Sequence, residues 1–184
     1  MRLNFSPFPG IATRRLELRQ LTSADAQNMF QLRSDPRVMK YLDRPAAKSP
    51  AEADLYIADM NRLIGNNEII LWGITKPPAG EIIGTICFWK IEKQNYRAEI
   101  GYMLHPDYHG HGIMKEALTA VIQFGFDEMQ LHSITANVNP ENAASIALLK
   151  SCGFVQEAYF RENYYFNGKF LDAVIFTLLN TASV

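Results

Sequence analysis

The stretch that decides the fold runs from Leu104 to Leu118 and reads Leu-His-Pro-Asp-Tyr-His-Gly-His-Gly-Ile-Met-Lys-Glu-Ala-Leu. Residues before it are β-branched or aromatic, which predicts strands, and apolar residues after it recur at helical spacing. Between the two patterns lies a loop that contains Gly110 and Gly112. The stretch therefore marks a strand, a loop and a helix in succession.

The residues before this loop predict antiparallel strands. Three strand-like runs cover 69–75, 82–91 and 98–104, and they are separated by the polar segments 76–81 and 92–97. Short polar connections of this kind are typical of hairpins, so the three runs are expected to form a meander.

Downstream, the order changes to helix 113–128, strand 133–138 and helix 143–151. A helix between two strands predicts a parallel crossover. The chain closes with two strand-like arms, 154–166 and 169–179, joined by Asn167-Gly168, the dipeptide favoured in tight type I′ hairpin turns.

The first third of the chain supplies one short strand, 16–21, and then helical patterns. The predicted helices cover 22–34, a short segment to Leu42, and 49–65, which begins with the capping box Ser49-Pro50-Ala51-Glu52. Together, these elements predict an α/β fold with a mixed, mostly antiparallel sheet of six or seven strands. A central parallel pair and helices on both faces complete this expectation, with residues 1–184 as a single domain.

Composition narrows the class of protein. The 184 residues are 48% apolar and 20% charged, which is ordinary for a globular chain. With 18 basic and 19 acidic residues, no basic excess points to nucleic acid. No apolar run is long enough to predict a membrane span, and no signal peptide is expected. Cys87 and Cys152 are far apart and flanked by apolar residues, which favours reduced thiols and a cytoplasmic protein.

The glycine loop is the main candidate for chemistry. The first turn of a helix offers unpaired amides and the positive end of its dipole, and glycines let an anion approach the backbone. Gly110 and Gly112 before a helix therefore indicate a phosphate cradle. Their spacing fits neither a mononucleotide P-loop nor a dinucleotide fingerprint, because Lys115 stands where the latter needs a third glycine. The alternative is a tight capping turn that binds nothing.

Three imidazoles, those of His105, His109 and His111, lie in the same loop. They raise the alternative of a zinc site, but their spacing is not that of a known structural site and no cysteine lies nearby in sequence. We expect no metal.

Two motifs make the interpretation specific. The stretch 98–104 followed by Tyr108-His109-Gly110-His111-Gly112-Ile113-Met114 resembles motif A of the GNAT superfamily of N-acetyltransferases. The stretch 137–145, ending in Cys152-Gly153-Phe154, resembles motif B. The remaining patterns resemble the ribosomal-protein N-terminal acetyltransferase (RimJ/RimL-like) branch, and the likeness covers nearly the whole chain.

The resemblance implies acetyl-CoA as co-substrate. The pyrophosphate would bind loop amides, the pantetheine would lie as an extra strand beside the end of strand 98–104, and the opening of helix 143–151 would approach the thiol. The implied binding residues are Met103, Leu104, His109, Gly110, His111, Gly112, Ile113, Met114, Asn142 and Ser145. The chain departs from the family at His109, where Gln or Arg is usual, and at Met114, where Gly or Ala is usual. It also has Leu149 where many members carry a tyrosine acid.

Acetyl transfer needs a base for the amine and an acid for the leaving thiolate. Ser145 is the candidate acid, because the branch has a serine near the sulfur; the alternative is a residue that only caps its helix. Glu99 is the candidate base, on the strand face shared with Gly101 and Met103. The alternative is a structural carboxylate, for example one paired with Arg97. On the terminal hairpin, the rivals for the base are Glu162 and Tyr164.

The amine pocket is expected between segment 36–60 and the terminal hairpin, which carry Tyr41, Tyr56, Tyr159, Tyr164 and Tyr165. These aromatics are otherwise ordinary core residues. The predicted function is transfer of acetyl from acetyl-CoA to a primary amine, with the α-amino group of a protein such as a ribosomal protein favoured. Alternatives are acetylation of a small amine (polyamine, antibiotic or amino acid) and a non-catalytic CoA-binding module. The chain is expected to be a monomer or a homodimer, without nucleic-acid or membrane partners.

Overall fold

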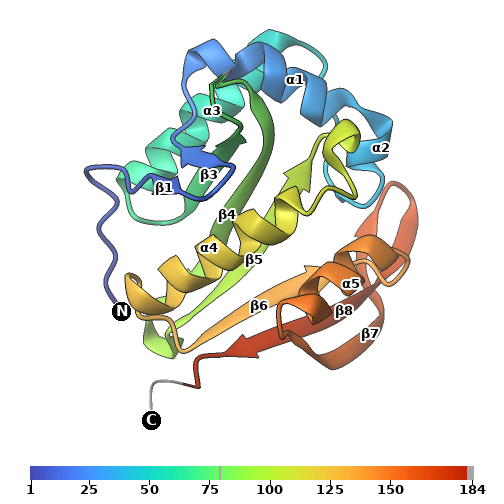
Figure 1. The fold of residues 1–184 in the computed structure, drawn as a ribbon. Helices are drawn as coiled ribbons and strands as arrows, with labels where there is room; N and C mark the ends of the chain where they lie inside the picture. The colour runs from blue at the N-terminus through green and yellow to red at the C-terminus, as the bar shows by residue number, and fades with distance from the viewer. Residues whose placement is uncertain (79, 182–184) are drawn as a thin grey trace.

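The computed structural model describes residues 1–78 and 80–181, and these form an eight-stranded sheet with helices on both faces (Figure 1). Its strands follow the order β1 (Ile11–Ala12), β2 (Glu17–Arg19), β3 (Ile70–Thr75), β4 (Ile82–Glu92), β5 (Arg97–Leu104), β6 (Ser133–Val138), β8 (Lys169–Leu179) and β7 (Val155–Phe166). The β5–β6 pair is parallel and the other neighbours are antiparallel. The predicted mixed α/β fold is confirmed. The sheet has one strand more than the seven expected, because the two-residue strand β1 pairs with β2 at its edge.

The helices at residues 50, 113 and 143 begin within one residue of the predicted starts. The helices are α1 (Ala26–Ser34), α2 (Pro36–Met39), α3 (Pro50–Gly65), α4 (Ile113–Asp127) and α5 (Ala143–Ser151), with 3₁₀ turns η1 (Ser23–Asp25), η2 (Lys93–Asn95) and η3 (Pro106–Tyr108). Ser49 Oγ accepts a hydrogen bond from the Glu52 amide at 3.2 Å, and Pro50 occupies the first helical turn. Before α1, the first predicted helical residues form the turn η1 instead.

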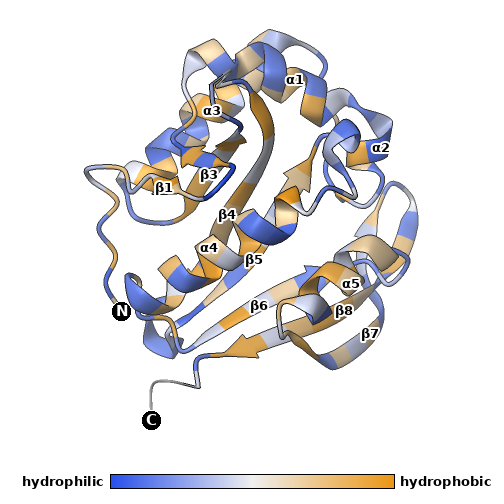
Figure 2. Cartoon of the chain, viewed as in Figure 1, coloured by the Kyte–Doolittle hydropathy of each residue, from blue (hydrophilic) through white to orange (hydrophobic). Residues whose placement is uncertain are grey.

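Both faces of the central strands are covered, because all six residues of β3 are buried. On one face, the Trp72 ring packs against Phe88 of β4 and Phe124 of α4, with ring centroids 6.3 and 5.3 Å away. Cys87 points to the opposite face by strand alternation, where Tyr56 of α3 influences it electrostatically. Thus α4 covers one face and the helices before β3 cover the other. Figure 2 shows the apolar residues concentrated along these central strands.

The sheet opens between β5 and β6. These strands pair only at Arg97–Ser133, Ala98–Ile134 and Glu99–Thr135. Beyond Glu99, β5 continues to pair with β4 as far as Leu104, and β6 continues to pair with β8 as far as Val138. The facing edges therefore separate, as Figure 1 shows, and the end of β5 leads directly into the glycine loop.

None of the helices within the described part of the chain is both long and apolar enough to cross a bilayer.

Candidate functional site

The glycine loop connects β5 to α4 through η3. Gly110 and Gly112 adopt left-handed backbone conformations, with φ of +75° and +70°, which side chains other than glycine rarely tolerate. Residues 109–112 are exposed, whereas Ile113 and Met114 are 3% and 8% exposed and anchor the start of α4 in the core. An exposed loop thus leads into a helix whose first residues are buried in the core.

A run of backbone amides in this loop has no internal partner. Within residues 1–78 and 80–181, no hydrogen-bond acceptor is recorded for the amides of Gly110, His111, Gly112, Ile113, Met114 and Lys115; the Glu116 amide is the first to bond back, to the Gly112 carbonyl at 3.1 Å. Unpaired amides at a helix N-terminus attract anions. A Cβ built on Gly110 would meet no atom within 4 Å, so the space beside the loop is open. The residues present therefore fit a phosphate group.

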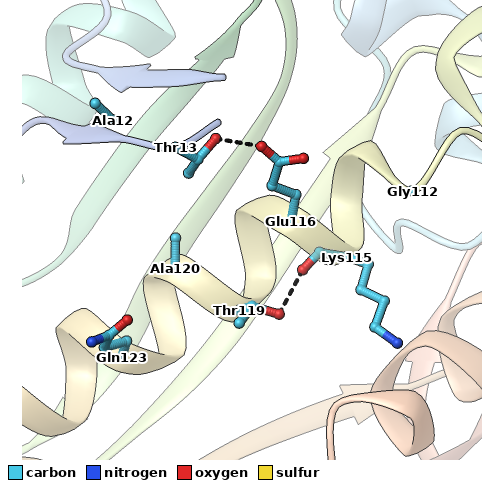
Figure 3. A pocket seen from close by; sticks show the side chains of 8 residues that line it. All are labelled: Ala12, Thr13, Gly112, Lys115, Glu116, Thr119, Ala120 and Gln123. Carbon is cyan, nitrogen blue, oxygen red and sulfur yellow. Dashed lines mark hydrogen bonds between the residues drawn. The ribbon is translucent and has the colours of Figure 1, made fainter. Parts of the chain in front are cut away.

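A polar brace from the N-terminal segment holds the loop. Arg15 Nε donates to Glu116 Oε2 at 2.6 Å and Arg15 Nη1 donates to the His111 carbonyl at 3.0 Å. Thr13 Oγ1 also donates to Glu116, at 2.7 Å. Beside this brace lies a groove of about 480 Å³ along α4 (Figure 3). In Figure 3, the Lys115 side chain points away from Glu116. Among described residues, Lys115 has no carboxylate within ion-pair distance.

The Glu116→Gln variant tests the brace through its pH dependence. Burial raises the pKa of Glu116, but the hydrogen bonds from Thr13 and Arg15 outweigh it and hold the pKa below its ordinary value. A lowered carboxylate pKa stabilises the fold above the unfolded-state pKa, and that gain is lost as pH falls through the folded-state pKa. We expect the variant to lose about 1 kcal/mol of unfolding free energy at neutral pH. Urea denaturation should show the two proteins converging in acid; a constant difference would contradict the brace.

The three loop histidines serve separate contacts. His105 Nδ1 accepts from the Asp107 amide at 3.3 Å, and His109 Nε2 lies 3.1 Å from the Leu104 carbonyl. The His111 side chain is not part of the brace, which uses its carbonyl. Within the described residues, no group of three or more His, Cys, Asp or Glu side chains is arranged to hold a metal ion.

Across the opening of the sheet, β5 is linked to the start of α5. Asn142 caps α5 by accepting from the Ser145 amide at 3.1 Å. The Ser145 hydroxyl lies 2.7 Å from the Tyr102 hydroxyl, so a side chain of β5 reaches α5 where β5 and β6 no longer pair. Burial raises the pKa of Tyr102 to about 12, although the bond to Ser145 acts in the opposite direction. Leu149, one turn further along α5, is fully buried.

Glu99 lies at the last β5–β6 pair. Its Oε2 accepts from Lys90 Nζ at 2.9 Å, and its side chain is 13% exposed. It borders a cavity of about 290 Å³ that Asn137 of β6 also lines. Arg97, the partner named as an alternative from the sequence, instead pairs with Glu92 at 2.8 Å. Arg97 is therefore not the partner of Glu99, because Arg97 stands opposite Glu92 in the β4–β5 register.

Glu99 and Tyr102 lie on opposite faces of the sheet. Tyr102 shares a face with Ile100, whose cross-strand partner Phe88 packs toward α4. Glu99 shares its face with Met103 and with its cross-strand partner Trp89. A carboxylate is therefore available on one side of the opening and a hydroxyl pair on the other.

The Glu99 face is covered by the loop after α2. Asp43 of this loop accepts a short hydrogen bond from Tyr164 of β7, and the guanidinium of Arg44 lies 5.9 Å from the Trp89 ring. Burial raises the pKa of Tyr164, and its bond to Asp43 adds to this. The loop thus spans the space between the sheet face and the terminal hairpin.

Arg33 also lies on this side, stacked on the Tyr56 ring at 3.9 Å. Its Nη1 is buried and has no hydrogen-bond partner among the described residues. Burial lowers the pKa of Arg33, and the positive charge of Arg44 acts in the same direction. Within residues 1–78 and 80–181, these two guanidinium groups have no carboxylate within ion-pair distance, and both flank this face.

The other residues named from the sequence for the base or the amine pocket take no part in these contacts. Glu162 lies in an exposed bulge of β7, where its amide donates to Asp172. Tyr159 donates to Asp172 at 2.5 Å, and Tyr165, which is 65% exposed, packs on Phe170. Tyr41 is approached by the Lys40 ammonium at 4.8 Å.

Sequence reasoning missed the brace, Tyr102, Lys90 and Arg33. Arg15 and Glu116 are 101 residues apart, and no local pattern joins them. Tyr102 had a usable signal, because alternation places it on the face opposite Glu99 and toward the helix that follows.

A family model and related proteins match this chain over most of its length. A family model described as an acetyltransferase (GNAT) domain matches residues 15–155. The uncharacterized N-acetyltransferase p20 of Bacillus licheniformis is 36% identical over 167 residues, which is 91% of this chain and 94% of that protein. The [ribosomal protein uS5]-alanine N-acetyltransferase of Escherichia coli is 33% identical over 108 residues, 58% of this chain and 56% of that protein.

One solved structure extends the match in fold. RimL, a ribosomal L7/L12 α-N-protein acetyltransferase in complex with coenzyme A, superposes with a TM-score of 0.85. The match covers 95% of this chain and 100% of RimL at 23% identity.

Proposed function

Since this chain belongs to the GNAT acetyltransferase family and is an N-acetyltransferase, we propose that it transfers acetyl from acetyl-CoA to the α-amino group of a protein N-terminus, such as that of a ribosomal protein. The observation that carries the proposal is the run of six unpartnered amides, Gly110 to Lys115, beside the unpaired end of β5. The relatives that act on ribosomal proteins support the acceptor.

Coenzyme binding uses main-chain groups on two sides in this proposal. The amides from Gly110 to Met114 bind the pyrophosphate, and the glycines leave room for it, whereas the His109 amide already donates to the Pro106 carbonyl. The edge of β5 at Met103 and Leu104 pairs with the pantetheine as a strand would. Asn142 fixes the start of α5, which brings Ser145 toward the thioester.

The chemistry divides between the faces of the sheet. The amine approaches from the Glu99 side, where the carboxylate takes its proton through a water molecule. Ser145 gives a proton to the thiolate that leaves on the other side. Lys90 holds the Glu99 carboxylate in place at 2.9 Å until the acceptor arrives.

The charges near the acceptor side favour a peptide over a polyamine. Arg33 and Arg44 lie beside Tyr56 and Trp89 without a carboxylate within ion-pair distance among the described residues, and like charges repel a polycationic acceptor. The free thiols of Cys87 and Cys152 support a cytoplasmic location.

An acceptor panel tests the function. The protein and acetyl-CoA are incubated with peptides that begin with Ala or Ser, the same peptides with a formylated N-terminus and an internal Lys, spermidine, an aminoglycoside and free amino acids. Thiol release measures turnover, and mass spectrometry locates the acetyl group. Acetylation of the α-nitrogen, lost on formylation, is the expected result. Turnover confined to a small amine supports the second function. CoA binding with neither turnover nor slow thioester hydrolysis supports a non-catalytic module.

Replacing Glu99 with glutamine tests the base. The amide keeps the shape but cannot accept the amine proton, so we expect kcat to fall about 100-fold at neutral pH. At higher pH, where more of the amine is already deprotonated, the deficit should shrink. Lys90→Met is the matched control, because it removes the partner and leaves the carboxylate. If Glu99→Gln retains wild-type kcat across the pH profile, Glu99 is a structural carboxylate.

A further inference from the structure

We infer that Tyr102 is a positioning residue for Ser145: its hydroxyl donates to Ser145 Oγ and thereby orients and resupplies the proton that Ser145 gives to the leaving thiolate. The inference rests on the proposed acetyl transfer and assigns a role to Tyr102, a residue of the stretch 98–104 that has no role in the predicted chemistry. It begins from the 2.7 Å contact between the two hydroxyl groups.

The direction of this hydrogen bond follows from acidity. Each hydroxyl carries one hydrogen, and a phenol is a far stronger acid than an aliphatic alcohol. Tyr102 therefore donates and Ser145 accepts, which leaves the Ser145 hydrogen free to point elsewhere. The Asn142 side chain bonds the Ser145 amide and leaves the hydroxyl available.

Position in the fold supports the same role. The bond joins β5 to the first turn of α5, three residues beyond the last β5–β6 pair, where the sheet opens. Tyr102 is half-buried on the face opposite Glu99, so the acid pair and the candidate base approach the opening from different sides.

Leu149 explains why a second hydroxyl is needed. It occupies the place of the tyrosine acid found in many family members, and it is fully buried and apolar. Ser145 precedes Leu149 by four residues, so both lie on the same side of α5. With Tyr102 behind it, Ser145 has a hydroxyl partner on the neighbouring strand in place of a tyrosine on α5.

Each proton given up in this step is replaced. As the carbon–sulfur bond breaks, its electron pair passes to sulfur and the Ser145 hydroxyl proton moves to sulfur. The Tyr102 hydroxyl proton moves to Ser145 Oγ. Water then reprotonates Tyr102, while the proton lost by the amine leaves through the base on the other face.

A double-mutant cycle tests the inference, with the best acceptor from the panel. Ser145→Ala is expected to lower kcat about 100-fold. Tyr102→Phe keeps the ring and is expected to lower kcat about 10-fold, with KM for acetyl-CoA and the calorimetric affinity for CoA little changed. In the Ser145→Ala background, Tyr102→Phe should cost nothing more, because Tyr102 acts through Ser145. Unchanged kcat in Tyr102→Phe, or a loss that is the same in both backgrounds, overturns the proposal.

A second measurement needs neither an acceptor nor the phenylalanine variant. Tyr102 is replaced by a difluorinated tyrosine, whose phenol can be titrated apart from the other tyrosines by its ultraviolet spectrum. The Ser145→Ala change removes the hydroxyl group 2.7 Å from the Tyr102 hydroxyl, so this titration point should shift. No shift overturns the inferred contact. A shift in a protein that acetylates no amine retains the contact and refutes only the proposed function.

Discussion

A Gly112→Val variant is expected to lose more than about 100-fold in affinity for CoA, because a branched side chain at this position stands in front of the amides that bind the pyrophosphate. Gly112 is the N-cap of α4 and has φ +70°. Among the described residues, an ideal Cβ there meets Arg15 Nη2 alone, at the ordinary contact distance of 3.5 Å. The valine is therefore free to extend into the open space in which we propose that the pyrophosphate binds. Isothermal titration calorimetry with CoA measures the loss.

The backbone cost of this change needs a matched control. Gly168 in the terminal hairpin has φ +80° and an ideal Cβ there meets its nearest atom only at 3.9 Å. Gly168→Val therefore has a similar conformational penalty, about 1–2 kcal/mol, far from the loop. Both variants should unfold at comparably lower temperatures, and only Gly112→Val should fail to bind. Wild-type affinity in a folded Gly112→Val protein would refute the cradle.

The second large effect is expected from Gly84→Ala, which should destabilise the fold by about 1–3 kcal/mol and weaken CoA binding at the same time. Gly84 of β4 pairs with Leu104 at the end of β5. A Cβ at Gly84 would lie 2.5 Å from the Met103 carbonyl oxygen and 3.1 Å from Leu104 Cα. These are main-chain atoms, so the strands themselves must move apart, and the displaced segment is the one that leads into the glycine loop.

Gly65→Ala is the control for this prediction. Gly65 ends α3, and a Cβ there would meet nothing within 4 Å. The same chemical change should leave stability within about 1 kcal/mol of wild type, on the stabilising side. Urea denaturation and CoA calorimetry on both variants separate a general effect of alanine from the clash. Equal stability of the two variants would show that β5 adjusts to the extra carbon.

Local signals were sufficient for most of the fold. The Ser49 cap, the Asn167-Gly168 turn and the β-branched and aromatic runs of the central strands each act over a few residues, and each is found where expected. The capping box at Ser49 forms only in part, because the Glu52 carboxylate accepts from the Lys48 amide and not from the Ser49 amide. The glycine loop was equally readable, because positive φ and free amides depend on residues next to each other. The two-residue strand β1 had no such signal, since so short a segment is defined only by its partner β2.

The site was less readable where it depends on contacts across the fold. Arg97 was one possible partner named for Glu99 if that carboxylate is structural, but the observed ion-pair partner of Glu99 is Lys90. The Tyr102–Ser145 contact joins residues 43 apart, and the Tyr164–Asp43 contact joins residues 121 apart. Such pairs are set by strand order and packing, which a single sequence encodes only indirectly.

The short seam between β5 and β6 has a thermodynamic consequence. Three residue pairs join the part of the sheet built from β1 to β5 to the part built from β6 to β8. A molecule that lies along the unpaired edge adds its binding energy to the folded state alone, and that increment grows with the logarithm of its concentration. The melting temperature of this enzyme should therefore rise with the logarithm of the acetyl donor concentration. The resistance of its C-terminal part to proteolysis should rise with that concentration in the same way.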